Sequence, residues 1–513
     1  MATAVKSFSI AGIDGYPVYI EASLLNTESQ SVNIIGMGDT AVKEAGERIQ
    51  SALTDCGFYM PEKKIVLSLA PADRKKRGSH YDLALAVALL AQAGEINPRE
   101  LEKYGFLGEL SLGGNLRPCT GILPMILAAK EAGVKHMIVP AENYGEAKLV
   151  SEVKIYPFWN LRQVTDFLEG KIDVPKMPEQ EKTGEKVGVK EPDFSEVRGQ
   201  NSLIDAIVLA AAGGHNLLMI GNPGCGKTMI ARRIPTILPT MSEEEALEVT
   251  KIHSISGLVP PGGGLLKERP FRAPHHNVSV NALIGGGANA MPGEISLSHN
   301  GVLFLDELGE FSVCALDALR QPLEDKKVVI SRVNYTNTYP ANFMFVAAMN
   351  PCPCGFYPGN KCRCSDYEIV KYRNKISGPI LDRIDIQKQV MPVDLFEPEK
   401  SAPAPTSAEL KARVESARRI QQKRFRNMPG ISCNAQMTSA MIDDFCEIDG
   451  ETKEFLRKAS EKFGYSARVV HKLLRMSRTS ADMAGAAKIR KEDVAFALHC
   501  RDLDKSNGRM MVV

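Results

Sequence analysis

The fold of this chain is decided by the stretch Gly221-Asn222-Pro223-Gly224-Cys225-Gly226-Lys227-Thr228. The apolar residues 216–220 before it predict a buried strand, and the spacing of residues 229–234 after it is typical of a helix. Glycines at such a strand-to-helix turn let successive backbone N–H groups approach a polyphosphate, and the start of the helix adds a favourable dipole. Lys227 can then reach the β- and γ-phosphates, and the Thr228 hydroxyl can bind Mg²⁺. We therefore predict a nucleoside triphosphate site rather than a glycine-rich turn with a chance lysine.

A second apolar run ends in two carboxylates. Residues 301–305 predict a strand that is buried on both faces, and Asp306 and Glu307 follow it directly. In open α/β sheets the ligand binds beyond the carboxyl ends of the strands. Asp306 is thus placed to hold Mg²⁺, directly or through water, and Glu307 to orient and deprotonate the attacking water. A surface acidic pair is the alternative, but the phosphate-binding loop upstream favours the catalytic interpretation.

Three further polar side chains are candidates for the chemistry. Asn350 follows the apolar residues 343–349, and a neutral amide there can hydrogen-bond the attacking water or the γ-phosphate without adding charge. Arg383 lies in a polar turn, and Arg468 lies at the start of a predicted helix. A guanidinium has a fixed fork of donors that suits the charge on phosphoryl oxygens in the transition state.

The composition is that of an ordinary globular protein long enough for several domains. Of the 513 residues, 44% are hydrophobic and 24% are charged, which predicts a sizeable core. The chain has neither a basic start before an apolar run nor about 18 consecutive apolar residues, so we expect a cytoplasmic protein without a membrane segment. Eleven cysteines, an odd number in a long intracellular chain, argue against a disulfide framework. The net charge of +2 does not exclude nucleic acid as a partner, because basic residues can gather in patches.

The first part of the chain, residues 1–170, has mixed α/β character, and a linker follows it. Residues 171–192 are rich in Pro, Glu, Lys and Gly and hold too few apolar residues to fold. The basic run Arg74-Lys75-Lys76-Arg77 predicts a solvated loop, with phosphate binding as the alternative. The expected elements are strands at 31–35 and 64–69, helices at 39–53, 82–92 and 125–132, and a strand with a hairpin turn at 106–114.

The last part, residues 401–513, is predicted to be mostly helical. A helical lid of this kind can clamp a nucleotide and move during hydrolysis. Residues 411–426 carry seven basic side chains, which allow either a phosphate-binding face or a solvated or intersubunit face. The expected helices are at 408–425, 438–447, 451–462, 467–484 and 491–500.

Four cysteines follow the strand that ends at Asn350. Cys352, Cys354, Cys362 and Cys364 form two Cys-x-Cys pairs whose thiolates would suit tetrahedral Zn²⁺. Structural zinc sites usually have two residues between paired cysteines, so zinc and free thiols both stay open. His275 and His276 also invite a metal interpretation, but adjacent side chains of a regular element point in different directions. Binding or packing is the better interpretation of the two histidines.

Taken together, these motifs resemble AAA+ ATPases, and more closely the magnesium-chelatase-like ComM/YifB family. The segments 269–276, 285–287 and 292–299 resemble an insertion that is characteristic of this family, and the cysteine pattern belongs to the resemblance. The resemblance implies an α/β fold with a Lon-protease-like α/β domain at 1–170, an AAA+ core at 193–400 and a C-terminal helical lid at 401–513. It also implies that Asn350 is the first sensor, Arg468 the second, and Arg383 an arginine finger that acts on ATP bound by the neighbouring subunit.

The Lon-like resemblance is carried by the segments 36–44, 69–73 and 107–112. Lon proteases use a serine and lysine dyad. The serine position aligns with His80 or its neighbour and the lysine position with Pro124, so the dyad cannot form and we expect no proteolysis. Ser79, beside His80, is interpreted as a turn serine.

The resemblance implies a homohexameric, Mg²⁺-dependent ATPase that acts as a DNA helicase in branch migration during natural transformation and recombination. ATP, Mg²⁺ and single-stranded or branched DNA are the implied partners, with zinc as a further metal. The alternative is a motor that remodels a protein partner or inserts a metal, as magnesium chelatase does. A nucleotide-gated scaffold without hydrolysis is less compatible with the intact set Lys227, Asp306, Glu307 and Asn350.

Overall fold

The computed structural model describes residues 3–25, 31–59, 63–177, 192–287, 289–332, 335–391 and 405–504. The chain divides into two compact units, which are described separately. The first unit holds Met1–Val187, Ala246–Leu266 and Val333–Thr338, and the second holds the remaining segments. Residues 178–191 of the predicted linker and the predicted boundary at 400 lie outside the described residues. The division at residues 170, 192 and 400 therefore stays a prediction.

The first unit is built on a seven-stranded sheet with the order β3-β4-β2-β1-β5-β8-β9. Its centre is the antiparallel hairpin of β1 and β2, in which Val5 pairs with Ile20. The predicted strands are confirmed as β3 and β4, whereas the β1–β2 hairpin was not predicted from the sequence. The strands are β1 (Thr3–Ala11), β2 (Asp14–Leu25), β3 (Ser31–Ile35), β4 (Lys64–Ala70), β5 (Tyr104–Phe106), β8 (His136–Pro140) and β9 (Lys154–Phe158), with a small hairpin of β6 (Glu109–Leu110) and β7 (Leu116–Arg117).

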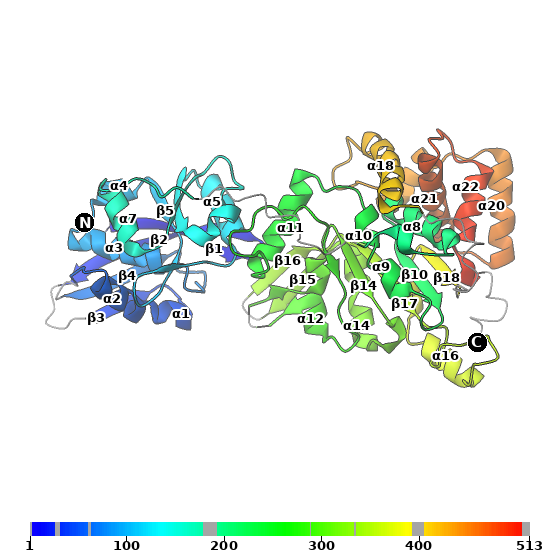
Figure 1. The fold of residues 1–513 in the computed structure, drawn as a ribbon, viewed down its shortest axis with the longest axis horizontal. Helices are drawn as coiled ribbons and strands as arrows, with labels where there is room; N and C mark the ends of the chain where they lie inside the picture. The colour runs from blue at the N-terminus through cyan, green and yellow to red at the C-terminus, as the bar shows by residue number, and fades with distance from the viewer. Residues whose placement is uncertain are drawn as a thin grey trace. The chain divides into compact units, whose positions relative to one another are not determined.

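Apolar helices cover this sheet (Figure 1). The helix α3 (Asp82–Ala93) is buried from Asp82 to Ala91 and ends at Gly94, whose φ of 89° closes the helix. The predicted helix at 39–53 is divided at Glu44 into α1 (Thr40–Lys43) and α2 (Ala45–Asp55). The remaining helices are α4 (Pro98–Leu101), α5 (Ile122–Glu131), α6 (Tyr144–Ala147) and α7 (Leu161–Leu168).

The structure places three residues on which predictions for the first unit depended: Lys76, Ser79 and Pro124. Lys76 is fully buried and its Nζ donates to the carbonyl of Pro71, so the basic run is not a uniformly solvated loop. Ser79 lies in the turn before α3 and its hydroxyl donates to Glu109. Pro124 lies within α5, so no lysine amine stands at that position. Among the described residues, Ser79 contacts a glutamate and position 124 offers no amine, so these two positions do not form a serine and lysine dyad.

The second unit is built on a five-stranded sheet with the order β11-β14-β17-β10-β18. All four strand pairs are parallel. The apolar runs predicted as strands are confirmed as β10, β14 and β17, but β18 was missed because polar residues interrupt its apolar pattern. The strands are β10 (Leu217–Gly221), β11 (Phe271–Arg272), β14 (Val302–Leu305), β17 (Met344–Met349) and β18 (Ile386–Val390). A short hairpin of β12 (Gly285–Gly286) with β13 (Met291–Pro292) accompanies them, and the unit also holds β15 (Lys327–Arg332). The strand β16 (Tyr335–Pro340) is divided between the segments assigned to the two units.

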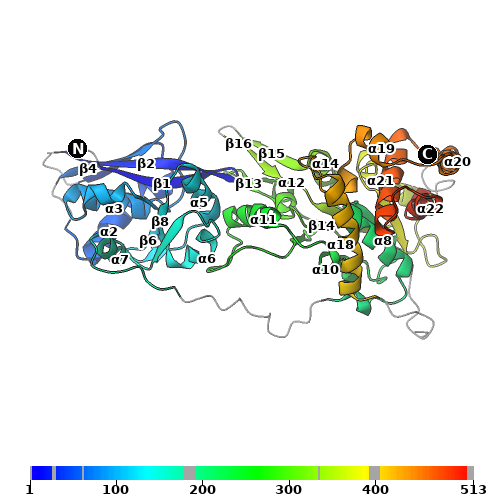
Figure 2. The ribbon, with the colours of Figure 1, turned by 90° about the horizontal axis from the view of Figure 1, so that it is seen from above.

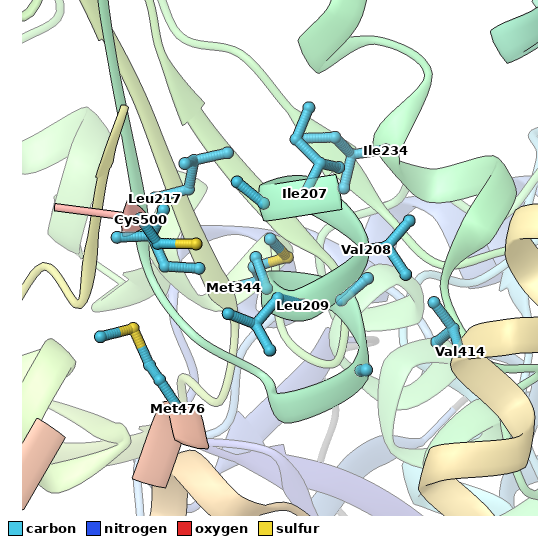
Figure 3. Close-up of a cluster of buried hydrophobic side chains, with 14 of the residues drawn as sticks. Ile207, Val208, Leu209, Leu217, Ile234, Met344, Val414, Met476 and Cys500 are labelled. Atoms are coloured by element: carbon cyan, nitrogen blue, oxygen red, sulfur yellow. The ribbon is translucent and has the colours of Figure 1, made fainter. Parts of the chain in front are cut away.

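The C-terminal helices share one hydrophobic core with this sheet (Figure 3). Leu209 of α8, Val414 of α18 and Met476 of α21 pack in the same cluster as Leu217 of β10 and Met344 of β17. The helices α18 and α21 both lie beside α8 (Figure 2). The predicted helices are confirmed as α18 (Ser407–Arg424), α19 (Ser439–Phe445), α20 (Gly450–Phe463), α21 (Ala467–Met483) and α22 (Lys491–His499). The C-terminal helices and the sheet are therefore one compact unit.

The other helices of the second unit are short, apart from α8. They are α8 (Asn201–Gly213), α9 (Lys227–Ala231), α10 (Ile234–Ile237), α12 (Val280–Ile284), α13 (Glu294–Leu297), α14 (Val313–Ala318), α15 (Arg320–Asp325), α16 (Asp366–Arg373) and α17 (Gly378–Leu381). A further helix, α11 (Glu243–Ile255), is shared between the segments of the two units. None of the helices in the described parts of the chain is both long enough and apolar enough to cross a bilayer.

Candidate ATP-binding and hydrolysis site

The glycine-rich loop joins β10 to α9 as predicted. Gly224 and Gly226 have φ angles of 77° and 87°, a region that glycine adopts without strain. The helix α9 begins at Lys227 and ends at Ala231, two residues earlier at its start than the sequence indicated. The loop therefore has the backbone geometry that a polyphosphate cradle requires.

Lys227 is held inside the loop and against the neighbouring strand. Its Nζ donates to the carbonyls of Gly221 at 2.7 Å and Asn222 at 3.0 Å, and to the Oδ1 of Asn350 at 3.1 Å. Only 8% of Lys227 is exposed. The strand order explains the contact, because β17 pairs with β10 and Asn350 directly follows β17. The structure thus brings together two residues that are 123 positions apart in the chain.

Thr228 and Asp306 meet at the same edge of the sheet. The Thr228 hydroxyl donates to the Oδ2 of Asp306 at 2.5 Å. A hydroxyl and a carboxylate are hard oxygen donors, which is the ligand type that Mg²⁺ prefers next to substrate phosphates. These two side chains therefore fit the predicted magnesium site.

Glu307 lies beyond β14 in an unusual backbone conformation. Its φ is 52°, a left-handed value that is uncommon for a non-glycine residue and that clusters at functional sites. Its side chain is 53% exposed, and its Oε2 lies 3.3 Å from the Nδ1 of His276. The sequence prediction missed this partner. No sequence signal pointed to it, because the contact arises from the pairing of β11, which ends four residues before His276, with β14.

The two histidines do not form a metal site. Their ring centroids are 4.0 Å apart, but the Nδ1 of His275 lies 3.3 Å from the backbone N of Asn277, while His276 contacts Glu307. Among the residues that the structure describes, the only group of three or more candidate metal ligands is the four-cysteine cluster.

Arg383 and Arg468 line the same cavity, and Lys227 is not among its lining residues. This cavity of the second unit has a volume of about 1080 Å³. The same cavity is lined by Asn216 and Asp385, which precede β10 and β18, so it opens at the amino ends of the parallel strands. The phosphate-binding loop lies at the carboxyl ends. A five-residue strand spans about 16 Å at 3.3 Å per residue, so neither arginine can reach the nucleotide bound by its own chain without a large rearrangement.

This cavity carries an excess of cationic side chains. The finger candidate Arg383 pairs with Glu324, and its Nη1 donates to Pro379 O at 2.6 Å. Burial lowers the pKa of Lys326 and of Lys472, with nearby carboxylates opposing the shift. The basic lining residues are Arg269, Lys326, Arg383, Arg418, Arg468, Lys472 and Arg475, against Glu244, Glu245, Glu324, Asp382 and Asp385. The lining therefore has seven basic and five acidic side chains, of which Arg269, Arg383 and Lys472 lie beside carboxylates.

The four cysteines form a compact cluster. The Sγ of Cys352 lies 3.4 Å from that of Cys354 and 3.7 Å from that of Cys362, and all four Sγ atoms lie within 4.8 Å of one another. Tetrahedral zinc with Zn–S bonds of about 2.3 Å requires sulfur atoms about 3.8 Å apart. Backbone hydrogen bonds from Arg363 and Phe356 lower the pKa of Cys354 to about 6, whereas desolvation and the neighbouring thiols raise the pKa of Cys362 and Cys364. The cluster could therefore hold a metal ion.

The cysteine loop also packs against the phosphate-binding loop. A Cβ atom on Gly355 would lie 2.5 Å from the Cδ of Pro223, and Gly355 has a φ of 85°. Only glycine fits this approach without displacing a neighbour. The cluster is thus part of the wall of the candidate nucleotide site, a proximity that the sequence spacing did not reveal.

The basic helix α18 is not one phosphate-binding face. Arg424 forms two hydrogen bonds to the buried Asp482, at 2.7 and 2.5 Å. Arg418 donates to the carbonyl of Ala211 at 3.1 Å. These two cations are used within the unit, so they are not part of a phosphate-binding face, and the solvated or intersubunit interpretation of the other five stays a prediction. The seven basic residues are Lys411, Arg413, Arg418, Arg419, Lys423, Arg424 and Arg426.

Comparison with known proteins gives three family matches along the chain. The family described as subunit ChlI of Mg-chelatase matches residues 20–143. Magnesium chelatase, subunit ChlI, matches 193–397, and its C-terminal family matches 404–501. The competence protein ComM of Haemophilus influenzae is 40% identical over 97% of this chain and 97% of its own. The chain belongs to the ComM/YifB family of magnesium-chelatase-like AAA+ proteins.

Two further relatives agree with this assignment. The uncharacterised protein YifB of Escherichia coli is 39% identical over 98% of this chain and 97% of its own. Lon protease 2 of Bacillus subtilis is 26% identical over 40% of this chain and 43% of its own. The ComM/YifB assignment agrees with the observed mixed α/β fold, its parallel sheet and its helical C-terminal region, and it supports an ATP-driven motor.

Proposed function

We propose that this ComM/YifB protein is a ring-forming, Mg²⁺-dependent ATPase whose hydrolysis sites are each built from two subunits. The observation that carries the proposal is the separation of Lys227 from Arg383 and Arg468 by the length of the sheet. The predicted role of both arginines is to stabilise charge at a γ-phosphate, which they cannot reach in their own chain. They can fill this role at the ATP bound by a neighbouring subunit. A head-to-tail arrangement of subunits places the cationic cavity of one against the nucleotide loop of the next, and such contacts close into rings.

In this site each side chain has a separate task. The backbone of residues 221–228 and Lys227 bind the phosphates, and Thr228 with Asp306 holds Mg²⁺, which neutralises phosphate charge when bound. Glu307 accepts the proton of the attacking water, and Asn350 orients that water or the γ-phosphate. Arg383 and Arg468 of the neighbouring subunit stabilise the charge that develops on the phosphoryl oxygens.

We propose DNA as the polymer that this motor moves, as a hexameric helicase in branch migration. The support is the resemblance over nearly the whole chain to proteins that include a competence protein. A protein-remodelling or metal-inserting motor is the competing function. Strand displacement on a forked duplex, measured with the native chain and with Glu307→Gln, separates the two. The helicase predicts ATP-dependent displacement that the variant loses, whereas ATP turnover without DNA stimulation or strand movement would favour the remodelling motor.

We propose that the four-cysteine cluster binds one structural Zn²⁺. The support is the gathering of four thiol sulfur atoms within 4.8 Å of one another, close to the spacing that tetrahedral zinc requires. In this position the ion would fix the loop that packs on Pro223.

A further inference from the structure

The segment between β11 and α13 forms a loop whose two ends are in contact. Arg272 of β11 and Glu294 of α13 close it through two hydrogen bonds of 2.6 and 2.7 Å. This bidentate pair is the strong, directional form of an arginine–carboxylate contact. The closed loop contains His276, the helix α12 and the hairpin of β12 and β13. The position of His276 is therefore fixed relative to the sheet.

Inside this loop His276 is held by its neighbours and points at Glu307. Its side chain is 26% exposed, its ring packs edge-on to Phe311 at a centroid distance of 6.5 Å, and its Nδ1 lies 3.3 Å from the Oε2 of Glu307. A histidine Nδ1 that carries a proton donates to a carboxylate in both the neutral tautomer and the charged ring. When its Nδ1 carries the proton, His276 therefore presents an N–H group to the carboxylate of the proposed general base at this distance.

Glu307 needs such a restraint. Its side chain is half exposed, and its backbone has the left-handed conformation that costs a non-glycine residue free energy. An unrestrained glutamate at the end of a strand samples several rotamers, only some of which bring a carboxylate oxygen to a water at the γ-phosphate. A misplacement of about 1 Å in a catalytic group can lower a rate by about a hundredfold.

We propose that His276 is a positioning residue for Glu307. One oxygen of the carboxylate accepts the hydrogen bond from His276, and the other stays free to take the proton of the attacking water. This inference rests on the proposed ATPase function. His276 does not touch the nucleotide in this arrangement, so it acts on the chemical step through Glu307 and leaves ATP binding to the loop of Lys227.

The chain offers a matched control in the adjacent histidine. The Nδ1 of His275 lies 3.3 Å from the backbone N of Asn277, and the contact with Glu307 is made by His276. The two ring centroids are 4.0 Å apart with the planes tilted by 36°, so His275→Ala and His276→Ala remove the same ring–ring contact. Only the second removes the donor to Glu307. His276→Asn is the conservative variant, because its amide nitrogen can replace the Nδ1 donor.

The test is steady-state ATP hydrolysis of the full-length protein, with binding of a fluorescent ATP analogue and thermal unfolding measured in parallel. We expect His276→Ala to lower kcat about tenfold with unchanged affinity for the analogue, and His275→Ala and His276→Asn to stay within about twofold of the native rate. In the background of Glu307→Gln, His276→Ala should cause no further loss, because residues that act as a unit are not additive.

Three results would overturn the inference. They are a native kcat for His276→Ala, an equal loss in His275→Ala, or a further tenfold loss when His276→Ala is added to Glu307→Gln. If His276→Ala lowers the melting temperature, the rate of His276→Asn tests the inference instead. This variant should keep both the melting temperature and kcat close to the native values, and a stable His276→Asn protein with a low kcat would contradict the inference. Failure of the ATPase proposal is distinguishable, because the native chain and Glu307→Gln would then hydrolyse ATP equally slowly.

Discussion

Lys227 and Arg383 lie at opposite ends of one parallel sheet. Lys227 follows the carboxyl end of β10, whereas Arg383 precedes the amino end of β18, the strand that pairs with β10 in register. Both residues suit a γ-phosphate, but one chain cannot present them to the same phosphate. The sheet thus separates the end that carries the predicted nucleotide loop from the end that carries Arg383, and the proposed function brings these two ends together between neighbouring subunits.

The contact between Gly355 and Pro223 predicts that the cysteine loop controls ATP affinity. Gly355→Ala adds a Cβ only 2.5 Å from the Pro223 side chain, so one of the two loops must move. We expect an affinity loss of about tenfold, equivalent to about 1.4 kcal/mol, in titrations with a fluorescent ATP analogue. Gly464→Ala is the control, because Gly464 also has a positive φ of 66° but no atom lies within 4 Å of its added Cβ. If Gly355→Ala and Gly464→Ala bind the ATP analogue with equal affinity, the position of the cysteine loop does not affect nucleotide binding.

The sulfur geometry predicts one zinc ion per chain. Elemental analysis of the purified protein should find zinc near one equivalent, and Cys364→Ser should lower that content and the melting temperature together, because a structural metal contributes folding free energy. Cys314→Ser is the matched control, since Cys314 is exposed and lies outside the cluster. A metal-free native protein with an unchanged melting temperature after chelation would contradict the zinc proposal.

The buried ion pair of Arg424 and Asp482 predicts a large stability effect in the C-terminal helices. The Asp482 side chain is fully buried and also pairs with Arg478 at 3.1 Å. Asp482→Ala leaves buried cations without a counter-charge, so we expect a loss of about 3–5 kcal/mol in the free energy of unfolding. Glu447→Ala removes the exposed pair with Lys488, in which both side chains are 68% exposed, and should cost less than about 1 kcal/mol. Denaturant unfolding of both variants measures the difference, and similar losses would show that the core does not depend on the buried pair.

The sequence predicted the local parts of the site better than the long-range ones. The strands β10, β14 and β17 were recognisable because strands buried on both faces are continuous apolar runs. The β1–β2 hairpin was missed because its strands are only partly buried, with polar residues between the apolar ones. Spacing in the sequence could not show that His276 reaches Glu307 or that Gly355 touches Pro223, since both contacts depend on strand order. The sequence also did not show that Arg383 and Arg468 share a cavity away from Lys227.

A mixing experiment with two inactive variants tests the central claim most directly. Lys227→Ala lacks a working nucleotide loop but keeps Arg383, and Arg383→Ala keeps the loop but lacks the finger, so each alone should lose about a thousandfold in ATP turnover. In a ring assembled from equal amounts of the two variants, an interface is complete only when the loop comes from the Arg383→Ala chain and Arg383 comes from the Lys227→Ala chain. About a quarter of the interfaces meet this condition, so the mixture should recover about a quarter of the native rate. If the mixture stays as inactive as its components, or if Arg383→Ala hydrolyses ATP at the native rate as a monomer, the two-subunit site is contradicted.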